Sequence, residues 1–282
     1  MFHPPHPETY RDQLRVFLRE DWGTQDWTTA SVPDRPMTAR VVAKADLVLA
    51  GLPVAAETLK LACGSLTIEL PKHDGQKVGA GTEVMRLRGS SHGILLAERV
   101  MLNLLQRLSG TATLTRKFVD AVEGTGARIL DTRKTTPGLK VLEKYAVRCG
   151  GGVNHRLNLS DGVLLKENHL AAVGGIRAAV EAARRMAPNL VKIEVEVENL
   201  GQLKACLDLP DVDGVLLDNM ELGQMREAVA LRDRSGRRLF LEASGNITLD
   251  RARAVAETGV DFLSVGALTH SAPSVDLSLR MD

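Results

Sequence analysis

The pattern of apolar and polar residues changes near Gly110. Beyond it, short apolar runs alternate with segments of helical length, which predicts β-strands linked by helices in a parallel sheet. The runs that predict strands lie at 128–130, 162–165, 190–197, 214–217, 238–241 and 261–265. A complete TIM barrel has about eight strands, so this shorter series predicts a barrel that is open or irregular.

The first part of the chain predicts a small α/β layer. A helix-like segment runs from Glu8 to Glu20, and β-like stretches follow at 37–49, 66–70 and 84–87. From Ile94 to Leu108 apolar residues recur at helical spacing, which predicts a helix that ends at Ser109 and Gly110. The change of pattern places a domain boundary near residue 110.

Composition restricts the class of protein. The 282 residues include 36 Lys and Arg against 35 Asp and Glu, so the formal net charge is only +1. A general nucleic-acid surface needs a broad basic excess, which this chain lacks. The three cysteines form no CxxC pair, which argues against a disulfide framework or a thiolate zinc site and fits a reducing compartment. The opening residues lack the apolar core of a secretion signal and no apolar run could span a membrane, so we expect a soluble cytoplasmic protein.

Cationic side chains concentrate between Leu130 and His169. This segment contains DTRKTTPGLK, GGGVNHR and LLKENH. Such a concentration predicts a site for a small anion with several charges. The cations that form it are Arg133, Lys134, His155, Arg156 and Lys166. Two other roles stay open, because Lys166 could be a Schiff-base nucleophile and His155 could be a hydrogen-bonded structural histidine.

Carboxylates alternate with apolar residues in the predicted strand at 190–197. Glu194, Glu196 and Glu198 therefore lie on one face of this strand. A solvent-facing edge strand would explain them, but parallel strands are normally covered on both faces, which favours the interior or mouth of the barrel. Asp218 ends the next strand. Glu196 and Asp218 together could hold Mg²⁺, which prefers oxygen ligands and commonly bridges to phosphates.

Glycine and other small residues follow the last two predicted strands, in EASGN from Glu242 and GALTH from Gly266. Ordinary turns would explain either segment alone. Two of them at the end of a barrel favour a phosphate site built from backbone N–H groups. Arg99 has a plainer context, because it shares a polar helical stripe with Asn103 and Gln106 that a solvated surface would explain.

The segments named above, taken in order with EKYAV, IEVEVEN, LLDNM and SVGALTHS, closely resemble the quinolinate phosphoribosyltransferase family. The resemblance spans nearly the whole chain and includes EDWGTQDWT and LAERVMLNLLQRLSG. It implies the type II phosphoribosyltransferase fold, with an N-terminal α/β sandwich at 1–110, joined by the C-terminal segment 268–282, and an irregular open α/β barrel at 111–267. It also implies a reaction with Mg²⁺ in which quinolinate and phosphoribosyl pyrophosphate give nicotinate mononucleotide, pyrophosphate and CO₂ for NAD biosynthesis.

Carried over motif by motif, the resemblance assigns roles to particular residues. The quinolinate carboxylates would be held by Thr132, Arg133, His155, Arg156 and Lys166, with Arg99 supplied by the partner in a homodimer. The catalytic positions would be Lys134, Glu196 and Asp218. Glu196 and Asp218 would also hold the metal. The 5-phosphate would be held by Ser244, Gly245, Gly266 and His270. Asn158 and Glu167 stand where the family usually has glycine and aspartate, which affects loop geometry without removing a charge from the site.

Three alternatives stay open beside this function. A paralogue on the same fold could act on another acid, although the intact His155, Arg156 and Lys166 argue against it. A barrel lyase would form a Schiff base at Lys166, which borohydride trapping would reveal. A non-catalytic phosphosugar-binding protein would bind its ligand without turnover.

Overall fold

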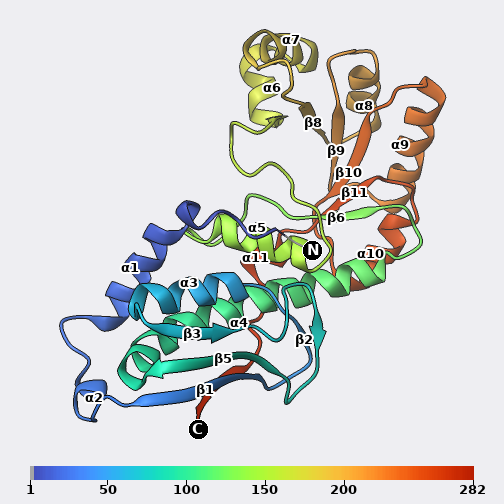
Figure 1. Ribbon diagram of the computed structural model, residues 1–282. Coiled ribbons are helices and arrows are strands. Elements are labelled where there is room, and N and C mark those ends of the chain that lie inside the picture. Colours follow the sequence, from blue (N-terminus) through green and yellow to red (C-terminus); the bar gives the residue numbers. More distant parts are fainter. Residues whose placement is uncertain (1–2) are drawn as a thin grey trace. The chain divides into compact units, whose positions relative to one another are not determined.

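A computed structural model describes residues 3–282 of the chain (Figure 1). The chain divides into two compact units, each with its own sheet. The first unit comprises the chain up to Arg116 together with Lys134–Gly151 and Ala267–Asp282, and the second comprises Lys117–Arg133 and Gly152–Gly266. Within the described residues, no helix has the length and apolar character needed to cross a membrane.

The first unit is built on an antiparallel sheet with the strand order β12-β1-β5-β3. Its strands are β1 (Pro36–Ala43), β3 (Leu66–Glu69), β5 (Glu83–Ser90) and β12 (Leu277–Met281), and a separate pair consists of β2 (Leu47–Val48) and β4 (Lys77–Val78). Its helices are η1 (Pro7–Thr9), α1 (Arg11–Trp22), α2 (Trp27–Ala30), α3 (Leu52–Ala62), α5 (Lys140–Cys149), α11 (Ala267–His270) and the long α4 (Ser91–Ala121), which continues into the second unit.

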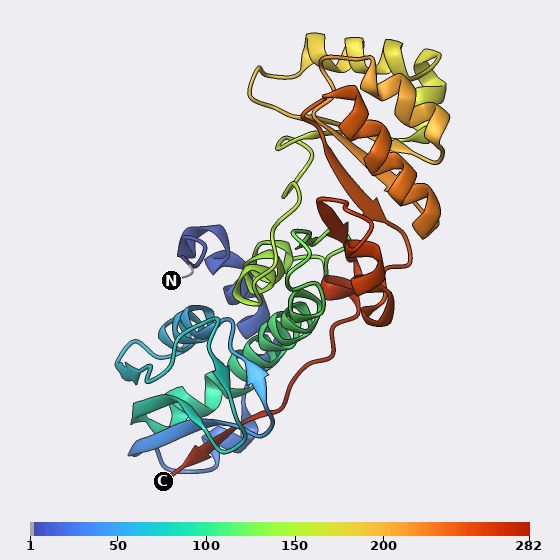
Figure 2. The same cartoon turned by 90° about the vertical axis from the view of Figure 1, so that its right-hand side faces the viewer.

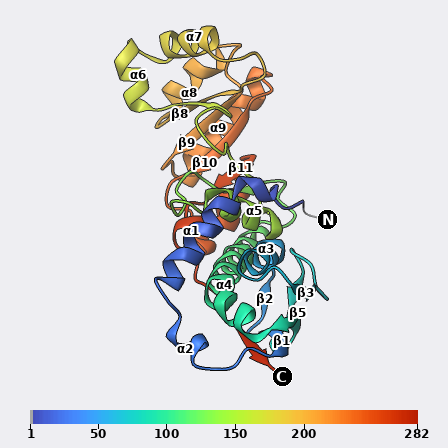
Figure 3. The ribbon, with the colours of Figure 1, turned by 60° about the vertical axis from the view of Figure 1, so that its left-hand side comes forward.

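Two apolar clusters hold the first unit together. One packs the sheet against α3 and α4, with Leu59 and Met101 fully buried in it. The other packs α1 and α5 against α3 and α4, with Leu14 and Leu104 among its members. Helices α3 and α4 therefore lie between the sheet and α1, as Figure 3 shows.

The prediction that a helix ends at Ser109 and Gly110 is wrong, because α4 continues to Ala121. A side chain at Gly110 would come within 2.1 Å of the carbonyl oxygen of Pro273. The glycine therefore lets the C-terminal segment cross the helix closely, and it does not end the helix. Helix interiors tolerate a glycine at a cost of about 1 kcal/mol.

The second unit contains a six-stranded parallel sheet with the order β6-β11-β10-β9-β8-β7. Its strands are β6 (Arg128–Leu130), β7 (Val163–Leu165), β8 (Ile193–Val197), β9 (Gly214–Asp218), β10 (Phe240–Ser244) and β11 (Phe262–Ser264). Helices α6 (Glu167–Val173), α7 (Ile176–Met186), α8 (Leu200–Leu207), α9 (Leu222–Ser235) and α10 (Leu249–Ala256) connect them. Figure 2 shows helices of this unit, in yellow and orange, in a row along one side of the sheet. The predicted α/β class and its parallel strands are confirmed.

The strand register sorts side chains between the two faces of this sheet. Glu196 lies opposite Leu216, which lies opposite Glu242, so these residues share one face. Val195 and Val197 point to the other face and are fully buried. The carboxylates of β8 are therefore on the face away from these valines, as predicted.

Candidate active site

Polar residues stand at the carboxyl ends of the strands in the second unit. Lys166 follows β7, and its Nζ lies 2.5 Å from Oε2 of Glu196 on β8. The two side chains are 48% and 17% exposed. An ion pair at this exposure contributes little to stability. The ammonium of Lys166 is therefore held in place by Glu196 and is accessible to an anionic ligand.

Two turns interlock at the ends of β9 and β10. Asn219 and Asn246 have positive φ angles of 52° and 50°, which are uncommon outside glycine. The N–H of Asn219 donates to the carbonyl of Ser244 at 2.9 Å, and its side-chain amide donates to Asp218 at 2.9 Å. A side chain at Gly245 would come within 2.1 Å of Oδ1 of Asn219. Backbone strain of this kind clusters at ligand sites, and here it fixes Asp218 beside Ser244.

A buried aspartate joins the end of β6 to the segment that carries His155. Asp131 is fully buried, and its carboxylate accepts hydrogen bonds from Nδ2 of Asn154 at 2.5 Å and from the N–H of His155 at 2.9 Å. These bonds hold the segment that leads to Arg133 beside the one that leads to Arg156. The structure thus brings together two parts of the predicted cationic site that are separate in sequence.

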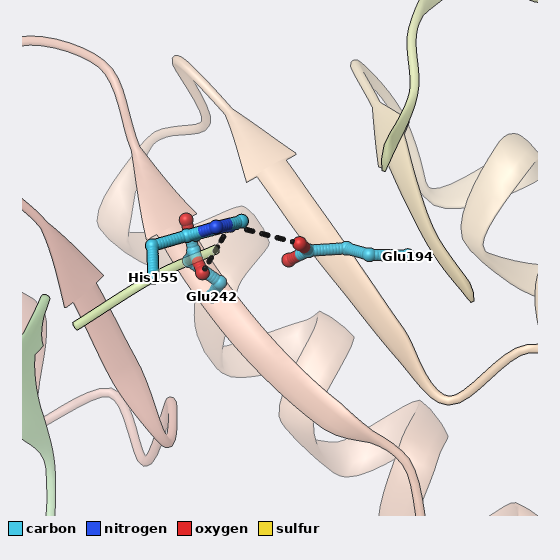
Figure 4. Close-up of side chains that lie close together, drawn as sticks. All are labelled: His155, Glu194 and Glu242. Carbon is cyan, nitrogen blue, oxygen red and sulfur yellow. Dashed lines mark hydrogen bonds and ion pairs between the residues drawn. The ribbon is translucent and has the colours of Figure 1, made fainter. Parts of the chain in front are cut away.

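Two buried carboxylates face the ring of His155 (Figure 4). Its Nε2 lies 3.0 Å from Oε2 of Glu194 and 3.6 Å from Oε2 of Glu242. Its Nδ1 accepts the backbone N–H of Arg156 at 2.7 Å, so the proton that Glu194 accepts lies on Nε2. The side chains of Glu194 and Glu242 are only 6% and 1% exposed. Glu242 also accepts a hydrogen bond from the hydroxyl of Ser264.

Glu242 is held in an environment that disfavours its charge. Burial, and next the charge of Glu194, raise the pKa of Glu242 to about 8. Oε1 of Glu194 and Oε2 of Glu242 have no hydrogen-bond partner among residues 3–282. Two such carboxylates do not both ionise readily, so the pair retains one proton near neutral pH.

The position of Glu242 corrects the sequence-based expectation. That expectation ended the strand at residue 241 and placed Glu242 in the turn that follows, whereas β10 runs to Ser244 and buries Glu242 in its middle. The ligand atoms of His155, Glu194 and Glu242 lie within 4.8 Å of one another, which would also suit a metal ion. The raised pKa of Glu242 also reduces the charge repulsion between its carboxyl group and that of Glu194.

Substitution of Glu242 by glutamine should change how stability depends on pH. The native carboxyl, with its raised pKa, retains a proton that the unfolded chain releases above about pH 4.5. The free energy of unfolding of the wild type should therefore fall, relative to that of Glu242→Gln, as pH rises from about 4.5 to about 8. We expect a relative change of roughly 2–5 kcal/mol, measured by urea unfolding at several pH values. Parallel pH profiles for the two proteins would contradict the prediction.

Two guanidinium groups form the cationic part of the site. Burial, and next the charge of Arg133, lower the pKa of Arg156, while Glu194 opposes them. Nη1 of Arg156 donates to the carbonyl of Gly162 at 2.8 Å, but its Nε has no hydrogen-bond partner in the described part of the chain. Thr132 precedes Arg133 and is half-buried. Neighbouring like charges repel, so a bound anion would relieve an unfavourable arrangement.

A cavity of about 240 Å³ adjoins Arg156 in the second unit. Its lining includes His155, Arg156 and Glu194, together with the rings of Phe240 and Phe262. The two rings meet edge to face with their centroids 5.5 Å apart. Phe240 and Phe262 begin β10 and β11, so the aromatic wall lies toward the amino ends of the strands, whereas Lys166 follows the carboxyl end of β7.

Three predicted site residues belong to the first unit. Arg99 is exposed on α4. The carbonyl of Lys134 accepts a hydrogen bond from Oγ1 of Thr269 at 2.7 Å, and His270 comes next in α11. The structure therefore joins the Lys134 segment to the His270 segment. Gly266, the remaining predicted phosphate residue, ends the second unit.

Parallel strands that end in cations, carboxylates and strained turns define the class of this protein, an α/β barrel enzyme for anionic substrates. Family models identify it further. The model of the N-terminal domain of quinolinate phosphoribosyl transferase matches residues 26–109, and that of the C-terminal domain matches residues 111–280. The chain belongs to the quinolinate phosphoribosyltransferase family.

Individual relatives agree with this membership. The chain is 45% identical over 277 residues to a carboxylating nicotinate-nucleotide pyrophosphorylase of Mycobacterium leprae, which covers 96% of each chain. It is 43% identical to a probable enzyme of the same name from Synechocystis, over 95% of this chain and 91% of the relative. The solved structure of nicotinate-nucleotide pyrophosphorylase from Francisella tularensis superposes with a TM-score of 0.95 at 39% identity, over 100% of this chain and 99% of that one.

Proposed function

We propose that this protein transfers the phosphoribosyl group of phosphoribosyl pyrophosphate to quinolinate and releases CO₂, giving nicotinate mononucleotide for NAD biosynthesis. The observation that carries the proposal is the neighbouring pair of guanidinium groups, Arg133 and Arg156, whose segments are held together by the hydrogen bonds of Asp131. Quinolinate has two carboxylates on one flat ring. The names of the relatives support the same reaction.

The proposed site has three functional parts. Its quinolinate part comprises Thr132, Arg133, His155, Arg156 and Lys166, with Arg99 from a second copy of the chain. Its catalytic part comprises Lys134, Glu196 and Asp218. Its 5-phosphate part comprises Ser244, Gly245, Gly266 and His270.

The chemistry follows from these charges. When pyrophosphate leaves, Lys134 stabilises the departing negative charge, and the nearby carboxylates stabilise the positive charge that develops on the ribose. The pyridine nitrogen, oriented by the cations around its carboxylates, then forms a bond to the ribose carbon. As CO₂ leaves, the electron pair of the breaking carbon–carbon bond stays on the ring carbon, where the adjacent quaternary nitrogen stabilises it, and this carbon then takes a proton from water to give nicotinate mononucleotide. The residues named here bind and orient both substrates and limit water around them.

Mg²⁺ fits the donor set at the strand ends. Glu196 and Asp218 supply carboxylate oxygens from neighbouring strands, and the register places both on one face of the sheet. Both side chains are partly exposed. When bound there, Mg²⁺ would neutralise charge on the pyrophosphate.

We also infer a homodimer in the cytoplasm. The three cysteines, Cys63, Cys149 and Cys206, are unpaired, which suits a reducing compartment. Arg99 is exposed and so available to a partner. A Schiff-base lyase is less well supported, because Lys166 is half exposed and ion-paired, whereas a nucleophilic lysine is typically desolvated.

The test of the function is nicotinate mononucleotide formation from quinolinate and phosphoribosyl pyrophosphate with Mg²⁺. Nicotinate, which has one carboxylate, should be a poor substrate because it would leave a cation of the site unpaired. We expect kcat/KM for nicotinate to be lower by roughly 100-fold or more. Equal specificity constants for the two acids would exclude a site built for two carboxylates.

A further inference from the structure

Arg107 of α4 is the centre of a polar network within the first unit. Its guanidinium donates to the carbonyl of Ala272 at 2.6 Å, to the carbonyl of Thr269, and to Oε1 of Glu143 at 2.9 Å. The side chains of Arg107 and Glu143 are 21% and 0% exposed. The network therefore joins α4 to α5 and to the segment that begins with α11.

Glu143 extends this network to the segment after Lys134. One carboxylate oxygen accepts the N–H of Thr136 at 2.9 Å, and the other accepts the hydroxyl of Thr136 at 2.8 Å. Thr136 is two residues beyond Lys134. Pro137 and Gly138, which follow it, are exposed, so apolar burial gives this turn little support.

Thr269 extends the network to Lys134 itself. Its hydroxyl donates to the carbonyl of Lys134 at 2.7 Å, while its own carbonyl accepts from Arg107. Thr269 is fully buried. The backbone of Lys134 is thus held directly at its carbonyl and, through Thr136 and Glu143, two residues further on.

Stability alone does not explain such an arrangement. A buried ion pair often contributes no more than well-packed apolar residues of the same volume. The same helices already share an apolar cluster that includes Leu108 and Leu142. The distinctive property of the network is that its hydrogen bonds hold backbone groups of Lys134, Thr136, Thr269 and Ala272, which lie at Lys134 or within two residues of Lys134 or His270.

We propose that Arg107, Glu143 and Thr269 are positioning residues that set the backbone of Lys134, and with it the ammonium that faces the departing pyrophosphate. The proposal rests on the function proposed above for Lys134. The three residues act through Lys134 and need not touch substrate. Their loss should therefore lower turnover more than it weakens quinolinate binding.

The sharpest test is Thr269→Val, which removes the hydroxyl and keeps the shape of the side chain. We expect kcat to fall by roughly 10- to 100-fold, because small displacements of a catalytic group have effects of this size. KM for quinolinate should stay within about 2-fold, because the cations around its carboxylates are unchanged. Thr269→Ser, which restores the hydroxyl, should recover most of the turnover.

The matched control is Thr58→Val. Thr58 is also fully buried in the first unit, and its hydroxyl donates to the carbonyl of Val54 at 2.9 Å, away from Lys134. The Thr58→Val variant should lose about as much thermal stability as Thr269→Val but keep the kcat of the wild type. Wild-type turnover in Thr269→Val, or equal losses of turnover in both variants, would overturn the proposal.

Hydrogen exchange of the 131–139 segment separates this proposal from the proposed function. Exchange should be faster in Thr269→Val and in Glu143→Gln than in Thr58→Val, because the first two variants release Lys134 or Thr136. Unchanged exchange would overturn the positioning role even in an active enzyme. A wild type that forms no nicotinate mononucleotide would instead reject the proposed function and leave the exchange result intact.

Discussion

Replacement of Arg156 by alanine should raise KM for quinolinate by roughly 10- to 100-fold, the effect of losing charge-assisted hydrogen bonds to a carboxylate. Arg156 is half-buried, its Nε has no partner among the described residues, and Arg133 is close enough to perturb it. Affinity for phosphoribosyl pyrophosphate should change little. Steady-state kinetics measures KM for quinolinate, and isothermal titration with each substrate separately measures the two affinities.

Replacement of Asp218 by asparagine should give the opposite pattern. The substitution keeps the side-chain volume and removes the negative charge that we propose for binding Mg²⁺ and stabilising the ribose, so kcat should fall by roughly 100-fold or more with quinolinate binding retained. The Mg²⁺ concentration needed for half-maximal rate should rise as well.

Arg177→Ala serves as a control for both variants, because Arg177 is an exposed residue of α7 in the same unit. The Arg177→Ala variant should match the wild type in its kcat and in its affinity for both substrates. If Arg156→Ala lost affinity for phosphoribosyl pyrophosphate and kept its affinity for quinolinate, the assignment of Arg156 to the quinolinate part of the site would be wrong.

Local pattern was sufficient to predict the strands of the second unit and the shared face of Glu194 and Glu196. Apolar runs of strand length mark each parallel strand, and the period of two places Glu194 and Glu196 on one face. These inferences need only short-range information.

Features that depend on distant contacts were missed or placed wrongly. Gly110 was interpreted as the end of a helix, whereas its role depends on Pro273, far along the chain. Glu242 was assigned to a turn because strand boundaries are weakly encoded, and its burial depends on Glu194 and His155. Arg107 was not identified as important, because no pattern near it in the sequence indicates its partners Glu143 and Thr269.

Mixing two inactive variants should restore activity if the site is shared between subunits. Arg99→Ala and Asp218→Asn should each be nearly inactive as homodimers. A symmetric dimer that places Arg99 of one chain in the site of its partner gives every mixed dimer one site with both residues intact. Random reassembly would make half of the dimers mixed, so activity should return to roughly a quarter of the refolded wild-type value.

The controls are each variant refolded alone and the refolded wild type, with the fraction of mixed dimers measured by native mass spectrometry. Arg99 lies on α4 in the first unit, and Asp218 lies on β9 in the second. The two substitutions are therefore far apart in sequence, and neither changes the residues next to the other. If Arg99 served the site of its own chain, each site in a mixed dimer would lack either the arginine or the aspartate. Confirmed mixed dimers without activity would therefore reject a shared site and leave Arg99 a role within its own chain or on the solvated surface.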